Sequence, residues 1–195
     1  MMRVSTINRK TTETEISITL NLDGHGICNV DSGIGFFDHM LVLFCKHGNF
    51  DINLTCSGDL QVDNHHTIED IGIVMGTAFN KALGTKIGIK RYGTFYCPMD
   101  EALSRICVDL SGRNYLVYDV TLLRDMVGEL ETDSLREFFY AFASNSQINL
   151  HINNLYGENT HHIVESIFKG LGRALREATE IIDINGEIPS TKGIL

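Results

Sequence analysis

The sequence predicts an α+β protein made by internal duplication, and three observations lead to that prediction. Segments of alternating, β-branched residues occur in each half of the chain, which is typical of small sheets. Each half also contains two longer segments with the apolar spacing of a helix. Finally, two adjacent histidines followed three positions later by a glutamate occur twice, 96 residues apart. One gapless register at this offset contains ten identities, which pair His65, His66, Glu69, Ile52, Asn53, Leu54, Ile71, Gly76, Ala78 and Ala82 with His161, His162, Glu165, Ile148, Asn149, Leu150, Ile167, Gly172, Ala174 and Ala178.

The first half is expected to contain a small sheet and two helices. Apolar spacing indicates a helix from Phe36 to Lys46, which stops near Gly48. A longer helix is expected over 65–83, with Asp63 or Asn64 as its N-cap and Gly84 after its last turn. The strands of this half are expected at 3–11, 15–22, 27–30 and 51–56, with a turn at 23–26.

The second half repeats this order. Helices are expected over 133–144 and 160–182, the latter capped by Asn159 or Thr160, and strands at 104–110, 114–122 and 147–153. Each small sheet has a face that must be covered, and two helices can cover it. We therefore expect residues 1–90 and 91–195 to be two copies of one unit, fused into one compact domain.

Composition narrows the class of function. No apolar run approaches the length of a membrane span, and the first residues lack a signal core, so a cytoplasmic protein is expected. The five cysteines are odd in number and form no pair spaced for a thiolate metal site, which favours buried, reduced thiols. A net charge of −9 disfavours nucleic acid and anionic membranes as partners. It still allows a small phosphorylated ligand, which needs only a few local cations.

Helical geometry limits how the repeated histidines can bind a metal ion. His65 and Glu69 are spaced i,i+4 and His66 and Glu69 i,i+3, so each histidine lies near the glutamate. The two histidines themselves point about 100° apart around the helix axis and cannot easily share one ion. We therefore expect two different ions, or one ion here and one across an interface. The same argument applies to His161, His162 and Glu165.

Two further histidines complete the ligand set, one from each half. His39 lies in the early helix and aligns with Leu135 in the repeat, whereas His151 lies on a strand and aligns with Thr55. Six histidines and two glutamates without thiolate suit Mn, Fe, Co or Zn, and open coordination positions would favour manganese or iron. The alternative for one copy is a helix start with a capping glutamate, or a hydrogen-bonded core histidine. Two copies in register favour the metal site.

Several segments resemble the imidazoleglycerol-phosphate dehydratase family, and together they span nearly the whole chain. They are 33–41, 58–70, 98–105, 109–113, 161–169 and 189–195. Two positions depart from the family pattern, which more often has aspartate at Asn64 and often has histidine at Glu137. The resemblance implies four helices sandwiched between two four-stranded mixed sheets. It also implies two Mn²⁺ ions per active site, ligands shared between neighbouring subunits, and a homo-oligomer of 24 subunits. The metal ligands it implies are His39, His65, His66, Glu69, His151, His161, His162 and Glu165.

The reaction that the resemblance implies is a dehydration in histidine biosynthesis. D-erythro-imidazole glycerol phosphate loses water to give imidazole acetol phosphate, through an imidazolate held between two metal ions. Glu13 matches the family's acid–base carboxylate, although alone it would be read as a solvated strand glutamate. Lys169 follows His162 by about two helical turns and is expected to contact the leaving oxygen or the phosphate. The positions that match phosphate binding are Arg91, Arg113, Ser190 and Lys192.

Two other classes of function remain as alternatives. A metal-storage cage would bind ions without turnover, but storage needs no phosphate-binding residues. A two-metal hydrolase of phosphate esters would be favoured by aspartate-rich clusters, which the sequence lacks. A manganese-dependent lyase is therefore the leading hypothesis.

Overall fold

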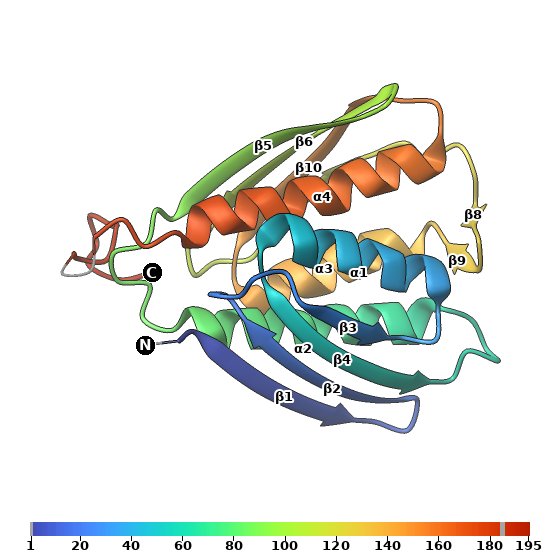
Figure 1. The fold of residues 1–195 in the computed structure, drawn as a ribbon, viewed down its shortest axis with the longest axis horizontal. Helices are drawn as coiled ribbons and strands as arrows, with labels where there is room; N and C mark the ends of the chain where they lie inside the picture. The colour runs from blue at the N-terminus through green and yellow to red at the C-terminus, as the bar shows by residue number, and fades with distance from the viewer. Residues whose placement is uncertain (1, 184–185) are drawn as a thin grey trace.

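The computed structural model describes residues 2–183 and 186–195, and over these residues it contains two four-stranded sheets with four helices between them (Figure 1). The strand orders are β1-β2-β4-β3 and β5-β6-β10-β7. This arrangement confirms the predicted α+β sandwich. One hydrophobic core lies between the sheets and takes side chains from both halves of the chain. No helix in the described ranges is long and apolar enough to cross a membrane.

The first sheet is a mixed sheet whose central strands pair antiparallel. β2 is antiparallel to both β1 and β4, and β3 runs parallel to β4 at the edge. Alternate residues of β2 are buried, because only one face of the sheet meets the helices. The elements of this half are β1 (Val4–Lys10), β2 (Thr14–Asn21), β3 (Cys28–Asp31), α1 (Gly35–Gly48), β4 (Asp51–Gly58) and α2 (His65–Leu83).

The second sheet repeats the order and the strand directions of the first. β6 is antiparallel to β5 and β10, and β7 runs parallel to β10. This match fits the predicted internal duplication. The elements are β5 (Tyr92–Met99), β6 (Ala102–Asp109), β7 (Tyr115–Asp119), a small hairpin of β8 (Met126–Val127) and β9 (Leu130–Glu131), α3 (Ser134–Ser146), β10 (Asn149–Tyr156) and α4 (Thr160–Thr179).

Three local predictions were wrong. Neither β5, which contains Gly93 and Pro98, nor the β8–β9 hairpin was predicted. The last helix, predicted to reach residue 182, is shorter. The helix ends at Thr179, because Glu180 leaves the helical backbone conformation (ψ 128°) and Ile181 forms a bridge with Ile89.

Side chains at equivalent positions of the repeat, Asp63 and Asn159, accept from the first backbone N–H groups of the two histidine-bearing helices. Asn159 caps α4 as predicted, with its side-chain oxygen accepting from the backbone N–H of His161 at 3.0 Å. Asp63, one of the two caps predicted for α2, accepts in the same way from the backbone N–H of His65 at 2.8 Å, whereas the side-chain oxygen of Asn64 accepts from the backbone N–H of Glu131. That bond ties the β8–β9 hairpin to the start of α2.

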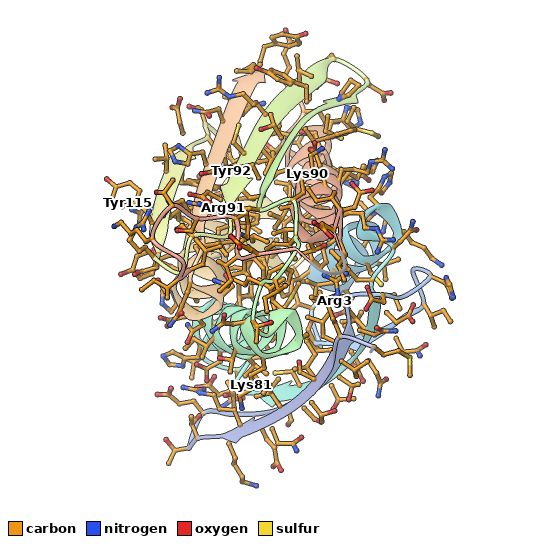
Figure 2. The ribbon with its side chains drawn as sticks, turned by 90° about the vertical axis from the view of Figure 1, so that its left-hand side faces the viewer. Arg3, Lys81, Lys90, Arg91, Tyr92 and Tyr115 are labelled. Carbon is orange, nitrogen blue, oxygen red and sulfur yellow. The ribbon has the colours of Figure 1, made fainter. Side chains whose placement is uncertain are left out.

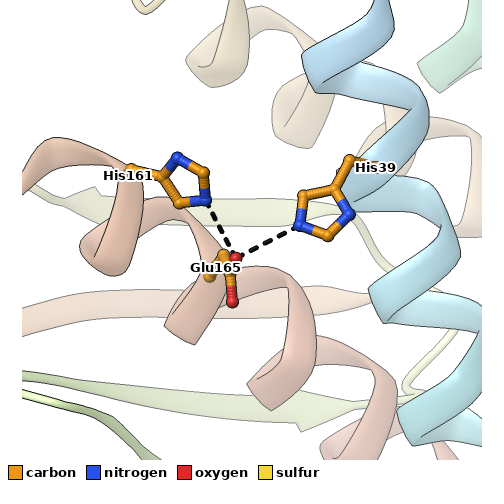
Figure 3. Close-up of side chains that lie close together, drawn as sticks. All are labelled: His39, His161 and Glu165. Carbon is orange, nitrogen blue, oxygen red and sulfur yellow. Dashed lines mark hydrogen bonds and ion pairs between the residues drawn. The ribbon is translucent and has the colours of Figure 1, made fainter.

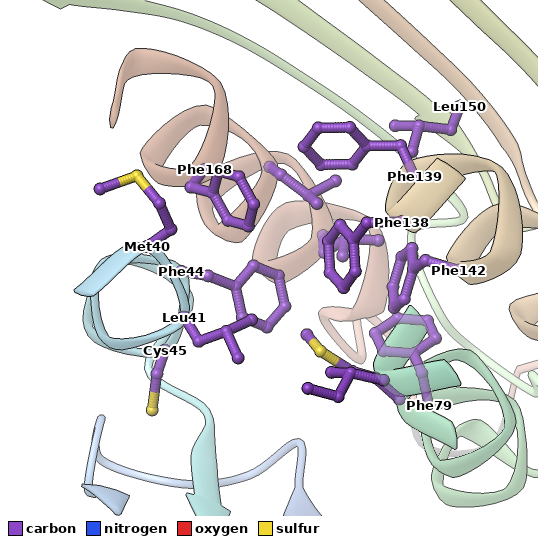
Figure 4. Close-up of a cluster of buried hydrophobic side chains, with 14 of the residues drawn as sticks. Met40, Leu41, Phe44, Cys45, Phe79, Phe138, Phe139, Phe142, Leu150 and Phe168 are labelled. Atoms are coloured by element: carbon purple, nitrogen blue, oxygen red, sulfur yellow. The ribbon is translucent and has the colours of Figure 1, made fainter. Parts of the chain in front are cut away.

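Each helix of the first half packs on a helix of the second half, α2 on α3 and α1 on α4, around a cluster of buried phenylalanines (Figure 4). Phe138 of α3 is fully buried, and its ring lies 5.1 Å from that of Phe37 and 5.6 Å from that of Phe168. Gly76 faces the backbone of α3, and its repeat partner Gly172 faces the backbone of α1. The glycine identity in the repeat therefore reflects the same close helix crossing in both halves.

The helix starts gather at one end of the molecule. α1, α2 and α4 begin at the end that carries the β1–β2 and β5–β6 turns, on the right in Figure 1. Both chain termini lie at the opposite end. All the histidines at helix starts therefore share one end of the sandwich.

Candidate functional site

The clearest cluster of potential ligands joins α1 to α4 (Figure 3). Oε1 of Glu165 lies 3.2 Å from Nε2 of His39 and 2.9 Å from Nε2 of His161. His161 and Glu165 are one helical turn apart, and the packing of α1 on α4 brings His39 to them. The three side chains offer ligand atoms within 4.8 Å of one another.

The charge of Glu165 suits a metal ligand. Burial by itself raises the pKa of this carboxyl, but hydrogen bonds from Lys169, His161 and His39 outweigh it and lower the pKa to about 2. Nζ of Lys169 lies 2.5 Å from Oε2 of Glu165. The carboxylate is therefore ionised at neutral pH. The structure also places Lys169, a predicted catalytic residue, directly beside the predicted ligands.

The start of α2 carries the repeat counterpart of this cluster, without a third ligand. Nε2 of His65 lies 3.8 Å from Oε2 of Glu69. At the position that corresponds to His39, α3 has Leu135, which is buried in the core. Among the described residues, the His39 cluster is the one group of three His, Cys, Asp or Glu ligands that meets the 4.8 Å limit.

The second histidine of each pair points away from the first. The rings of His65 and His66 meet at 89°, and those of His161 and His162 at 78°. Nδ1 of His66 lies 3.0 Å from a carboxylate oxygen of Asp59. This divergence agrees with the helical geometry and leaves the two rings of a pair facing different surroundings.

Carboxylates surround these second histidines, and sequence reasoning missed most of them. Nδ1 of His162 lies 2.6 Å from Oε2 of Glu101, and its Nε2 lies 3.8 Å from Asp100. The hydrogen bonds that His162 and His66 donate to Glu101 and Asp59 raise the pKa of these two histidines. Asp100 and Glu101 occupy the β5–β6 turn, which is equivalent to the β1–β2 turn that holds Glu13. Had β5 been predicted, Asp100 and Glu101 would have been expected in a strand turn at the same end of the molecule as the histidines.

Glu13 lies at the histidine end of the molecule. It sits in the turn between β1 and β2, where the hydroxyl of Thr11 accepts from its backbone N–H. Its carboxylate is half-exposed and lies 4.0 Å from Nε2 of His66. The structure thus brings this predicted acid–base residue to the edge of the predicted metal site.

All four predicted phosphate-binding residues line one open pocket of about 780 Å³, at the other end of the molecule. Arg91 is held there by Asp109, with Nε and Nη2 at 2.7 and 3.2 Å from its carboxylate oxygens. Nη1 of Arg91 also donates to the carbonyl of Pro189 at 2.7 Å. Arg113, Ser190 and Lys192 complete the cationic and polar lining. Figure 2 views the molecule from this end and labels Arg91.

His151 does not join the other histidines. It lies on the exposed outer face of the second sheet, paired with Cys107 of β6 and Val117 of β7. Asn149, two residues earlier, donates to the carbonyl of Arg113 at 2.9 Å. His151 therefore lies toward the cationic pocket and away from the start of α4.

The cationic pocket and the histidine cluster are separated by the length of α4. The backbone N–H of Arg91 donates to the carbonyl of Ala178 in the last turn of α4, whereas His161 lies in its first turn. At 1.5 Å per residue these helix positions are about 25 Å apart. A small phosphorylated ligand of the kind that the sequence predicts is far shorter than this distance. The two parts therefore cannot contact one small ligand within the same chain.

Fold and side chains together define a class of protein: a duplicated α+β enzyme scaffold with a histidine–carboxylate cluster and a separate pocket for an anion. Comparison with known proteins then identifies the family. A family model described as imidazoleglycerol-phosphate dehydratase matches residues 32–175. The chain belongs to this family and is an enzyme, one of the lyases of histidine biosynthesis.

Curated relatives and solved structures agree with this assignment. The imidazoleglycerol-phosphate dehydratase of Oceanobacillus iheyensis is 57% identical over 195 residues, covering 100% of both chains. That of Clostridium botulinum is 56% identical, covering 99% of this chain and 98% of its own. The Staphylococcus aureus enzyme structure matches with a TM-score of 0.82 at 38% identity, covering 90% of this chain and 97% of its own. The Pyrococcus furiosus structure, in complex with (S)-C348, gives 0.84 at 37% identity and covers 97% and 100%.

Proposed function

We propose that this chain dehydrates D-erythro-imidazole glycerol phosphate to imidazole acetol phosphate with two Mn²⁺ ions per active site. The observation that carries the proposal is the placement of a histidine cluster around an ionised Glu165 at one end and a cationic pocket at the other. Family membership supports the reaction, since the relatives are named for it. The pocket suits the phosphate and the histidine end suits the imidazole.

The side chains present fit a divalent ion. Nε2 of His39 and His161 converge on one oxygen of Glu165, and a nitrogen–carboxylate set without thiolate is suited to Mn²⁺. We assign His39, His161 and Glu165 to one ion, and His65 with Glu69 to a part of the second. His66, His162 and His151 would supply the remaining ligands from their own or neighbouring copies. When bound, the ions would withdraw electron density from the substrate's imidazole ring.

Residues of the chain would handle the protons. In this dehydration, hydroxide leaves the carbon attached to the ring, and a proton leaves the neighbouring carbon. The resulting enol becomes the ketone. Glu13, whose carboxylate borders His66, is assigned as the base that takes the carbon-bound proton. Lys169 is assigned to the leaving oxygen, because its ammonium lies beside Glu165 and far from the cationic pocket of its own chain.

A complete site would require more than one copy of the chain. The pocket and the histidine cluster lie about 25 Å apart along α4, and His151 lies on an exposed sheet face near the pocket. Bringing the pocket end of one copy to the histidine end of another would complete the site. We therefore propose a homo-oligomer with sites at subunit interfaces, and 24 subunits as the family resemblance suggests.

The activity test is a product assay on the purified protein. Protein stripped of metal by a chelator and reloaded with Mn²⁺ is expected to form imidazole acetol phosphate, and the stripped protein is not. A Glu13→Gln variant, loaded equally, should lose most turnover while still binding Mn²⁺. Absence of product from protein that carries its full complement of ions would refute the proposed reaction.

The shared site has its own test, by complementation. A His161→Ala chain lacks a ligand at the histidine end, and an Arg113→Gln chain lacks a cation at the pocket end. Assayed alone at a substrate concentration below the wild-type KM, each should be nearly inactive. In assemblies mixed in equal amounts, about a quarter of the sites would combine two intact ends. Activity that stays at the level of the separate variants would contradict a site shared between copies.

A further inference from the structure

Two carboxylates outside the predicted ligand set hold the second histidine of each pair. Oδ2 of Asp59 lies 3.0 Å from Nδ1 of His66, and Oε2 of Glu101 lies 2.6 Å from Nδ1 of His162. An ionised carboxylate can only accept hydrogen bonds, so each contact requires a proton on Nδ1. A neutral ring protonated at Nδ1 has its lone pair on Nε2.

The two carboxylates come from different places in the two halves. Asp59 follows β4, whereas Glu101 lies in the turn between β5 and β6. By strand order Glu101 corresponds to Glu13 in the equivalent β1–β2 turn, whereas Asp59 aligns with Leu155 in the 96-residue register. The repeat therefore did not supply this arrangement by copying. Each half has reached the same contact on Nδ1 from a different element.

A second hydrogen bond indicates the same tautomer for His162. The side-chain oxygen of Asn159 accepts from the backbone N–H of His161, so its amide nitrogen is the group that faces His162. That nitrogen lies 3.5 Å from Nε2 of His162, where an amide N–H can only donate. Nε2 therefore acts as an acceptor, as it would toward a metal ion.

Glu101 is itself anchored to the start of α4. Its Oε1 accepts from the backbone N–H groups of Glu158 and Asn159, at 3.1 and 2.8 Å. One carboxylate oxygen thus holds the loop that precedes α4 while the other holds His162. The position of the imidazole is in this way fixed relative to the helix that carries His161 and Glu165.

We propose that Asp59 and Glu101 are positioning residues that fix the Nδ1–H tautomer and the ring orientation of His66 and His162, and so present Nε2 as a metal ligand. The inference rests on the proposed metal-binding function of these two histidines. Partners of this kind orient ligating histidines, and their loss weakens metal binding by about 10- to 100-fold.

The decisive variant is Glu101→Gln, which keeps an oxygen for the two backbone N–H groups but turns an amide N–H toward Nδ1. Nδ1 must then accept, so the proton moves to Nε2 and blocks the lone pair. We expect Mn²⁺ affinity, measured by electron paramagnetic resonance titration, to fall about 10- to 100-fold. Nuclear magnetic resonance of metal-free protein with labelled histidines should show the ring of His162 changing tautomer. Glu158→Gln, an exposed neighbour, is the matched control.

The two readouts separate this inference from the proposed function. If the wild-type protein binds no Mn²⁺, the proposed function fails, while the tautomer measurement still tests the positioning role. Unchanged Mn²⁺ affinity together with an unchanged tautomer in Glu101→Gln would overturn the inference. If that variant does not fold, Asp59→Asn tests the same inference at His66, with the same two measurements and the same expected changes.

Discussion

Replacing Gly76 with alanine tests how closely the histidine-bearing helix α2 approaches its neighbour α3. A Cβ added there would lie 2.6 Å from the carbonyl oxygen of Phe142 and 3.0 Å from both Cβ of Asn145 and the backbone nitrogen of Ser146. Ordinary contact begins near 3.4 Å, so the helices would have to separate by 3.4 − 2.6 = 0.8 Å. The opposing atoms belong mostly to the backbone and cannot rotate away.

The expected loss follows from two opposing effects. Overpacking of a core typically costs about 1–3 kcal/mol. Alanine gains about 1 kcal/mol over glycine in a helix interior. Because the displaced helix carries fully buried phenylalanines, we expect Gly76→Ala to lower the free energy of unfolding by about 1–2 kcal/mol. For a protein of this size the melting temperature would fall by about 2–8 °C.

The assay compares thermal melts and urea unfolding of Gly76→Ala with those of Gly35→Ala. Gly35 has no atom within 4 Å of an added Cβ, so its substitution should be neutral or slightly stabilising. Gly172→Ala should behave like Gly76→Ala, since its added Cβ would meet Gly48 N at 2.9 Å. A Gly76→Ala protein as stable as Gly35→Ala would refute the close helix crossing.

Three further predictions concern the core and the cationic pocket. Phe138→Ala should lower the free energy of unfolding by about 3–5 kcal/mol, whereas Phe138→Leu should cost less than about 2 kcal/mol in urea titrations; equal losses would contradict its central packing. Burial lowers the pKa of Lys86, so the unfolded state binds more protons and wild-type stability should rise as pH approaches the ordinary lysine pKa of 10.5. Lys86→Met should raise the melting temperature at pH 7 by an amount that shrinks toward pH 10, and a pH-independent difference would argue against a buried ammonium. If the proposed function holds, Arg113→Gln should raise KM with an unchanged melt, whereas Arg91→Gln should also cost about 1–3 kcal/mol by leaving Asp109 unpaired; an unchanged KM in both would exclude the pocket from substrate binding.

Local pattern was enough to predict the architecture because each element is encoded by its own residues. Alternating β-branched segments and helical apolar spacing identified most strands and every helix, and Asn159 was recognised as a cap from its position alone. β5 was missed because glycine and proline weaken a strand pattern that the neighbouring β6 supplies by pairing. β5 is preceded by Arg91, which lines the cationic pocket, and is followed by Asp100 and Glu101, which lie beside His162.

The sequence by itself determined the repeat, the divergence of adjacent histidines around a helix, and the residue types suited to a metal and a phosphate. These follow from spacing along one helix and from side-chain chemistry. Only the tertiary structure decided which residues meet. The packing of α1 on α4 places His39 beside Glu165, and the β5–β6 turn brings Glu101 within hydrogen-bond distance of Nδ1 of His162. His151 lies on the outer face of the second sheet, toward the cationic pocket. The reason is physical: contacts between elements depend on how helices and sheets pack across the core, which no local spacing records.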